Sequence, residues 1–310
     1  SSVVSLESAL RRGWRRRGLL ACFLAPLAMV FASVVAIRRF AYRRGAIASR
    51  RLPAAVIVVG GISVGGTGKT PLVIWLVEAL RARGFNPGVV SRGYGGALRV
   101  PRAVGPRDSA AEVGDEPLLI ARRTRAPLWI GADRVAAGEA LLRHEPTCDV
   151  IVADDGLQHY RLCRDVEIAV VDGPGVGNGW LLPAGPLREP LKRLRAVDAV
   201  VAAAGVWPKR VDRRSLARVF SMAITGDRFY RLEDPGFACG VAELRGKRLH
   251  AVAGIGNPQR FFAHLARLGL RFERHSFSDH HPFRTGDLDF ENCDAIVMTE
   301  KDAVKFPADL

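Results

Sequence analysis

Residues 63–70 constrain the fold of this chain more than any other part of its sequence. They read SVGGTGKT, follow the β-branched apolar run 54–59, and precede a stretch with helical spacing at residues 71–83. A glycine-rich turn between a buried strand and a helix is the context in which a phosphate-binding loop works. Its backbone N–H groups surround phosphate oxygens, and the helix N-terminus contributes its dipole. The segment therefore predicts a nucleoside triphosphate site on a strand–loop–helix unit.

The side chains of this loop indicate the expected ligands, ATP and Mg²⁺. We expect Lys69 to reach the β- and γ-phosphates and the hydroxyl of Thr70 to bind the metal ion. Ser63 stands where the usual pattern has its first glycine. The predicted nucleotide-binding residues are Ser63, Val64, Gly65, Gly66, Thr67, Gly68, Lys69 and Thr70.

The loop alone does not separate kinases from GTPases and from motor or partition ATPases. Partition ATPases carry a signature lysine at the position of Val64, and the NKxD motif with which GTPases read their base is absent. Both of these classes are therefore disfavoured. The alternative is a glycine-rich turn that arose by chance and binds no nucleotide. The intact GKT triplet, which follows a strand in the sequence, argues against it.

Strand-like and helix-like segments alternate after residue 51. Short apolar runs rich in β-branched residues predict buried strands at residues 54–59, 87–90, 128–130, 149–153, 166–171 and 196–203. Helical spacing between several of them predicts a parallel sheet with helices on both faces. The expected fold class is α/β, with a P-loop NTPase-like parallel sheet domain, an N-terminal membrane helix and a second, smaller α/β domain.

The position of the second domain follows from a break in this alternation. The pattern weakens near residues 220–232 and resumes with strands at 248–253 and 295–299 and a helix at 259–268. We therefore expect a basic membrane-associated segment at residues 1–50, a P-loop kinase domain at 51–220 and a smaller α/β domain at 221–310.

An uncharged apolar run at residues 19–37 has arginines on both sides. The flanking residues are Arg11, Arg12, Arg15, Arg16, Arg17, Arg38, Arg39, Arg43 and Arg44. The run is near the lower limit of about 17–25 residues for crossing a bilayer. A spanning helix would place one cluster against the positive-inside rule, and the charge after the run disfavours a cleaved signal peptide. We expect a helix, kinked at Pro26, in the cytoplasmic leaflet, where each arginine gains about 1 kcal/mol from anionic headgroups. A spanning helix and a buried core helix remain alternatives.

The net charge of +15 admits nucleic acid, anionic lipid or a phosphorylated substrate as partner. Nucleic acid is disfavoured, because the arginines cluster beside an apolar run and not among aromatic residues. The five cysteines are widely spaced and form no CxxC pair, which disfavours a zinc site or disulfide framework and favours a reducing compartment. No obligate protein partner is expected.

Two pairs of acidic residues are candidates for metal binding or proton transfer. Asp154 and Asp155 follow the strand at 149–153, and the carboxyl ends of parallel strands face the ligand crevice. One of them can hold Mg²⁺, and a helix cap or solvated turn is the alternative. Asp115 and Glu116 could supply a general base or metal ligand, or could simply favour a helix N-terminus.

Three loops are further candidates, each with an ordinary structural loop as the alternative. In residues 91–96 (SRGYGG), an arginine and a tyrosine on glycine turns suit phosphate or sugar recognition. Residues 178–190 form a long loop after a strand, and such loops are often functional. Residues 278–283 (SDHHPF) contain His280 and His281, one of which could tune a base or contact a phosphate.

Seven motifs follow one another along the chain: SVGGTGKTP, SRGYGG, GDEP, ADDGLQH, GNGWLLPAGPLREP, SDHHPF and TEKDAVKF. Together they resemble the tetraacyldisaccharide 4′-kinase family, from about Arg11 to the end of the chain. The resemblance implies transfer of the γ-phosphate of ATP to the 4′-hydroxyl of a tetraacylated glucosamine disaccharide 1-phosphate in lipid A (lipopolysaccharide) biosynthesis. It also implies that this lipid A precursor and an anionic membrane surface are the partners, with the active site on the cytoplasmic face of the inner membrane.

The resemblance also implies roles for individual residues. Asp115 looks like the catalytic acid/base, and His280 would raise or orient its basicity; the choice of His280 over His281 rests on the resemblance. The implied Mg²⁺ environment is Thr70, Glu116 and Asp155, and the implied substrate contacts are Tyr94, Asp154, Gln158, Arg188 and Glu189. If His280 comes from the smaller domain, the two domains must close for catalysis.

Two other functions stay open at this point. A P-loop kinase or ligase acting on a soluble metabolite would use the phosphate loop but leave the arginine-flanked apolar segment without a role. A partitioning or other non-enzymatic ATPase at the membrane would turn over ATP without phosphorylating an acceptor.

Overall fold

The computed structural model describes residues 13–14, 16–93, 100–203, 205–232, 234, 236–279 and 281–306. The chain forms two compact units. The first, called here the P-loop unit, consists of Ser1–Arg92, Leu98–Ala103 and Ala126–Ala223. The second, called the C-terminal unit, consists of Gly93–Ala97, Val104–Arg125 and Ile224–Leu310.

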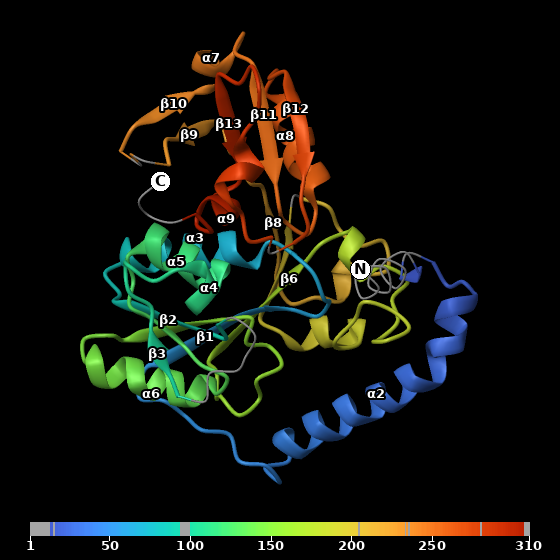
Figure 1. The fold of residues 1–310 in the computed structure, drawn as a ribbon. Coiled ribbons are helices and arrows are strands. Elements are labelled where there is room, and N and C mark those ends of the chain that lie inside the picture. The colour runs from blue at the N-terminus through green and yellow to red at the C-terminus, as the bar shows by residue number, and fades with distance from the viewer. Residues whose placement is uncertain are drawn as a thin grey trace. The chain divides into compact units, whose positions relative to one another are not determined.

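An eight-stranded sheet forms the centre of the P-loop unit, with the strand order β3-β4-β2-β5-β1-β6-β7-β8 (Figure 1). Its strands are β1 (Ala55–Gly61), β2 (Pro87–Ser91), β3 (Arg102–Ala103), β4 (Leu128–Ile130), β5 (Val150–Asp154), β6 (Val166–Val171), β7 (Ala199–Ala203) and β8 (Val219–Met222). All neighbouring strands are parallel except β3 and β4. The predicted parallel sheet is therefore confirmed. Val59 of β1 pairs with Asp154 of β5, which brings the carboxyl ends of these two strands together.

The P-loop unit also contains helices and short 3₁₀ helices, of which the first precedes β1 and the others lie between strands. They are α2 (Leu19–Arg43), α3 (Lys69–Arg81), α6 (Arg134–His144), η1 (Pro174–Val176), η2 (Leu191–Ala196) and η3 (Arg213–Ser215). The side chain of Asp133 accepts a hydrogen bond from the N–H of Val135 and caps α6.

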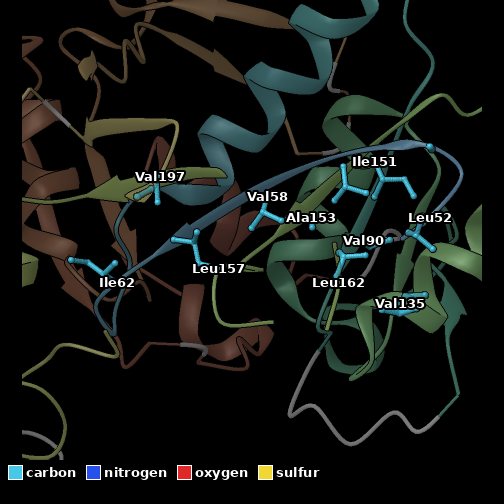
Figure 2. Close-up of a cluster of buried hydrophobic side chains, with 14 of the residues drawn as sticks. Leu52, Val58, Ile62, Val90, Val135, Ile151, Ala153, Leu157, Leu162 and Val197 are labelled. Carbon is cyan, nitrogen blue, oxygen red and sulfur yellow. The ribbon is translucent and has the colours of Figure 1, made fainter. Parts of the chain in front are cut away.

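The core of the P-loop unit also fixes the loop between β5 and β6. Leu157 and Leu162 come from this loop and are fully buried among strand residues such as Val58 and Ile151 (Figure 2). Each buried leucine contributes roughly 1.5–3 kcal/mol. A Cβ on Gly60 would lie 2.8 Å from Leu157, so this close approach requires glycine. The loop that carries Asp155 is therefore held by apolar packing.

Helix α2 carries a large apolar surface. It has 25 residues and a window with mean hydropathy 2.5, so it is long and apolar enough to cross a membrane. Pro26 lies inside it, and its buried residues are Ala21 and Ala28. Its exposed large apolar side chains are Leu19, Leu20, Phe23, Leu27, Met29, Val30, Val34, Ile37 and Phe40.

The C-terminal unit contains a three-stranded parallel sheet with the order β12-β11-β13. Its elements are α4 (Ala110–Val113), α5 (Asp115–Thr124), β9 (Arg228–Tyr230), β10 (Ala238–Gly240), α7 (Val241–Leu244), β11 (Leu249–Ala253), α8 (Pro258–Arg267), β12 (Phe272–Ser276), η4 (Thr285–Leu288), β13 (Ala295–Met298) and α9 (Glu300–Ala303). Phe262 and Leu265 of α8 pack with Ala251 of β11 in its core.

The unit to which residues 104–125 belong could not be read from the order of elements. The sequence placed them inside the domain at 51–220, whereas the structure groups them with residues 224–310. Helix α5 packs against α9, and an ion pair joins Arg123 to Glu300. These contacts join segments that are far apart in the sequence, so a linear division of the chain does not reveal them.

Candidate active site

The phosphate loop connects β1 to α3 within the P-loop unit. Gly65 and Gly68 have φ angles of 104° and 84°, in the left-handed region that favours glycine. Gly68 is the N-cap of α3, so the first N–H groups of this helix lack intrahelical acceptors. Lys69 and Thr70 begin the helix and are buried. This arrangement suits the binding of phosphate oxygens by backbone N–H groups.

The backbone at Ser63 explains why serine can replace the usual first glycine. Its φ lies outside the left-handed region, and it forms an antiparallel bridge with Leu187. The N–H of Val64 donates to the carbonyl of Pro186 at 2.9 Å. The loop therefore begins with extended backbone, which any residue can adopt. The same bridge brings the segment that carries Arg188 to the phosphate loop.

Asp155 joins two cations beside the phosphate loop. Its Oδ1 lies 3.5 Å from Lys69 Nζ, and its Oδ2 accepts a hydrogen bond from Arg188 at 2.8 Å. Burial opposes ionisation of Asp155, but Lys69 and Arg188 outweigh it, so the pKa of this carboxyl lies below its ordinary value. Oδ1 is buried and has no hydrogen-bond donor among the described residues. An ionised carboxylate oxygen of this kind, together with the hydroxyl of Thr70, fits a Mg²⁺ ion.

Asp154 and Arg134 form a more deeply buried layer. Asp154 is 2% exposed and accepts a hydrogen bond from Ser91 Oγ at 3.0 Å. Arg134 is 4% exposed, and burial lowers its pKa to about 10, although Asp154 and Asp155 oppose this shift. Arg134 therefore remains charged at neutral pH and adds positive charge near both carboxylates.

Glu189 is the centre of a buried hydrogen-bond network. It is 1% exposed and accepts hydrogen bonds from Gln158 at 2.8 Å and from the hydroxyl of Tyr160 at 2.5 Å. Arg193 Nε lies 3.3 Å from Glu189 Oε2, the same oxygen that accepts from Tyr160. Gln158 also donates to the carbonyl of Gly61 at 3.0 Å. The network ties the loop after β5 to the end of β1 and to the segment after Arg188.

A second cluster lies within the C-terminal unit, around Lys301. Its ammonium lies 3.1 Å from Glu116, 3.6 Å from Asp115 and 3.8 Å from Asp279. Burial lowers the pKa of Lys301, but Glu116, Asp115 and Asp279 outweigh this and raise it overall. Asp115 is 7% exposed and stands in the first turn of α5, where a negative charge is favoured. The cluster can hold an oriented carboxylate ready to accept a proton.

Two of the expected site residues, Tyr94 and His280, lie outside the described residues. The neighbouring His281 is described, and its Nε2 lies 3.1 Å from Asp287. Its ring packs 4.7 Å from that of Phe277. The expectation that the two domains close for catalysis assumed that His280 and Asp115 lie in different domains. In the structure, residues 104–125 and 224–310 belong to one unit.

A family model described as Tetraacyldisaccharide-1-P 4'-kinase matches residues 20–309. The chain belongs to this family. The resemblance that the seven motifs indicated is therefore confirmed.

Individual members of the tetraacyldisaccharide-1-P 4'-kinase family match nearly the whole chain. A tetraacyldisaccharide 4'-kinase from Azoarcus sp. (strain BH72) is 53% identical over 94% of this chain and 85% of its own length. One from Herminiimonas arsenicoxydans is 49% identical over 97% of this chain and 86% of its own length. The solved structure of the "apo" form of LpxK from Aquifex aeolicus in complex with ATP has a TM-score of 0.78 and 29% identity, over 93% of this chain and 91% of that one. The fold is therefore that of a P-loop kinase of this family.

Sequence reasoning missed several residues of both clusters in this family member. Lys301 lies in the motif TEKDAVKF, which carried part of the resemblance but no assigned role. Tyr160 follows ADDGLQH directly, and Arg193 follows the LREP segment. Their roles depend on contacts with Glu189, and only their nearness to recognised motifs could have indicated them.

Proposed function

We propose that this chain is an ATP-dependent lipid kinase that phosphorylates the 4′-hydroxyl of tetraacyldisaccharide 1-phosphate in lipid A biosynthesis. The observation that carries the proposal is the phosphate loop with Lys69 and Asp155 beside it, in a chain of the family named for this reaction. A kinase acting on a soluble metabolite would leave the exposed apolar side chains of α2 without a role.

Nucleotide binding is assigned to residues 63–70. Lys69 would bind the β- and γ-phosphates, and the N–H groups of the loop would bind phosphate oxygens. Thr70 and Asp155 would hold Mg²⁺, with Glu116 as a further ligand or water-mediated contact. The ion would neutralise charge that develops on the transferred phosphoryl group. Arg188, which hydrogen-bonds to Asp155, is placed to keep this carboxylate ionised and directed toward the loop.

Acceptor binding is assigned to Tyr94, Asp154, Gln158, Arg188 and Glu189. Arg188 is about one-third exposed, so part of its guanidinium is accessible to an anionic headgroup. Glu189 is buried and already has three partners, so it would support acceptor binding by holding Gln158 and Tyr160 in position.

Proton transfer is assigned to Asp115, with His280 as its partner. The N–H of Glu116 donates to Asp115 Oδ1 at 3.0 Å and orients the carboxylate. The Lys301 ammonium lies 3.6 Å from Oδ2, and an ammonium beside a carboxylate favours the charged form of both groups. Asp115 would accept the proton of the 4′-hydroxyl as the oxygen attacks the γ-phosphate.

Membrane association is assigned to α2, in an interfacial orientation. Before the helix, Trp14 Nε1 donates to the carbonyl of Pro183 at 2.9 Å. At its other end, the ring of Tyr42 lies 5.8 Å from that of Tyr160. Both ends of the helix thus contact the same unit, so α2 would lie along one leaflet with its apolar side chains in lipid. The cytoplasmic leaflet of the inner membrane is the proposed location.

Transfer of labelled γ-phosphate to tetraacyldisaccharide 1-phosphate in neutral detergent micelles tests the function. Labelled lipid should form with the wild type and nearly disappear with Asp115→Ala. Hydrolysis of ATP by the wild type without labelled lipid would contradict the proposal and favour a membrane ATPase or a soluble acceptor.

A further inference from the structure

A pocket of about 290 Å³ opens in the P-loop unit between the last turns of α2 and the segment after Tyr160. Of its twelve lining residues, five are arginines and one is a glutamate. The arginines are Arg39, Arg43, Arg51, Arg164 and Arg193. The lining is thus strongly positive, and the volume is close to the lower end, about 300 Å³, of pockets that hold small ligands.

Three of these arginines are neutralised within the unit. Arg51 pairs with Asp165 at 2.8 Å. Arg164 and Arg193 share the carboxylate of Glu167, at 3.1 and 2.5 Å, and Arg193 also lies 3.3 Å from the carboxylate of Glu189. Arg193 is only 2% exposed, so its ion pairs hold a buried part of the pocket lining in place.

Arg39 and Arg43 are different, because neither has a carboxylate partner among the described residues. They are four positions apart on α2 and therefore lie on one face of the helix. Their guanidinium groups therefore bring uncompensated positive charge to a pocket whose other arginines are paired with carboxylates. A phosphate is the anion that arginine forks bind best.

The surroundings of the pocket point to a membrane lipid as the source of this phosphate. Val34, Ile37 and Phe40 are exposed on the last turns of α2, and Tyr42 and Tyr160 are among the residues that line the pocket. Tyrosines with apolar neighbours are typical of the level at which lipid headgroups lie. The pocket would therefore open at headgroup depth if α2 lies in the interface.

The phosphate loop does not line this pocket, since none of residues 63–70 is among its lining residues. Arg51 precedes β1, whereas the phosphate loop follows it, and a seven-residue strand spans about 20 Å. At its other side, Tyr160 and Arg193 contact Glu189, which is linked through Gln158 to the end of β1. The pocket is therefore a neighbour of the predicted acceptor contacts and not a part of the phosphate loop.

We propose that this pocket binds the headgroup phosphate of an anionic glycerophospholipid through Arg39 and Arg43. The bound lipid fixes the carboxyl end of α2 at the membrane surface. This inference rests on the proposed interfacial position of α2, but not on the identity of the phosphate acceptor.

The test compares two double variants that remove the same charge from the same helix end. Arg39→Gln/Arg43→Gln removes the pocket arginines, and Arg38→Gln/Arg44→Gln removes two neighbours that do not line it. Binding of the full chain is measured, without substrate, to vesicles of phosphatidylcholine alone and of phosphatidylcholine with phosphatidylglycerol. In both variants, each removed arginine loses its general electrostatic attraction to anionic lipid, which should weaken binding to anionic vesicles roughly fivefold per arginine. The pocket variant should lose about tenfold more, and binding to neutral vesicles should be equal.

Equal losses in the two variants would overturn the pocket proposal and leave only general electrostatic attraction. Failure of the wild type to bind any vesicle would instead overturn the interfacial position of α2. The kinase assay in neutral detergent distinguishes a phospholipid headgroup from the 1-phosphate of the acceptor as the ligand of the pocket. An unchanged KM for tetraacyldisaccharide 1-phosphate in Arg39→Gln/Arg43→Gln supports a phospholipid ligand. A KM raised only in this variant would assign the pocket to the 1-phosphate of the acceptor and overturn the proposal.

Discussion

The ammonium of Lys301 lies 3.6 Å from the carboxylate of Asp115 and connects two segments of the C-terminal unit that are far apart in the sequence. Its position is fixed from the C-terminal side by Asp302, which is fully buried. Asp302 accepts a hydrogen bond from the N–H of Gly254 at 3.1 Å and forms an ion pair with Lys305 at 2.8 Å. Lys301 is therefore held in place by the packing of α9 and is well suited to orient Asp115.

Replacement of Lys301 by methionine should lower kcat about 100-fold, because the base loses the cation that orients it and favours its charged form. KM for ATP should not change. The acidic limb of the kcat–pH profile should move to higher pH, and Lys301→Arg should restore part of the rate. Because its pKa is raised above 10.5, Lys301 stays protonated at neutral pH, so its contribution is complete there and is lost only as pH rises through the shifted pKa. The exposed Lys247→Met serves as control. An unaltered pH profile in Lys301→Met would show that Lys301 does not act through the base.

Asp155→Asn should lower the free energy of unfolding by roughly 1–2 kcal/mol at pH 7, because Lys69 and Arg188 lose their shared partner. The pKa of Asp155 is lowered in the folded protein, so its stabilising contribution is present above the ordinary value of 3.8 and is lost as pH falls through the shifted pKa. Urea unfolding at pH 7 and at a series of pH values that descends from 3.8 follows Asp155 from its ionised to its protonated state. A difference that persists unchanged at the lower pH would contradict the assigned ion pairs, and exposed Asp289→Asn is the control.

Glu189→Gln should destabilise the P-loop unit by about 3 kcal/mol, because Glu167 would be the only carboxylate left beside the buried charge of Arg193 among the described residues. The matched control is Glu139→Gln, since Glu139 forms an exposed ion pair with Arg50 that is worth less than about 1 kcal/mol. Urea unfolding of the two variants gives the comparison. Similar small losses in both would mean that Glu189 is not the centre of a structural network.

The interfacial position of α2 predicts that both of its ends face the cytoplasm. Cysteines introduced as Arg16→Cys or Arg44→Cys, with all five native cysteines replaced by serine, should react with a membrane-impermeant maleimide only in inverted membrane vesicles. Labelling of either position from the periplasmic side of spheroplasts would show that the helix spans the bilayer. A cysteine at the buried position Val58 serves as a control that stays unlabelled from both sides.

Much of the P-loop unit could be predicted because its signals are local. The strand expected at residues 54–59 is β1 (Ala55–Gly61), and the helix expected at 71–83 is α3 (Lys69–Arg81), which begins two residues earlier. The helical spacing of residues 118–124 also predicts a helix, and in the structure that helix begins earlier, at Asp115, which places this carboxylate in the first turn of α5. Sequence periodicity does not locate such ends, because the first turn of a helix is defined by its cap and not by its apolar face.

The sequence by itself determined the phosphate loop, the parallel direction of the main strands and the apolar helix, because each depends on backbone geometry or on periodicity over a short stretch of the chain. Only the tertiary structure decided that residues 104–125 belong with the C-terminal unit and that Glu189 is a buried centre for Gln158 and Tyr160. It also placed Lys301 beside Asp115. These relationships join segments distant in the sequence, and they arise because burial leaves each charged group dependent on whichever partner the packing brings within reach.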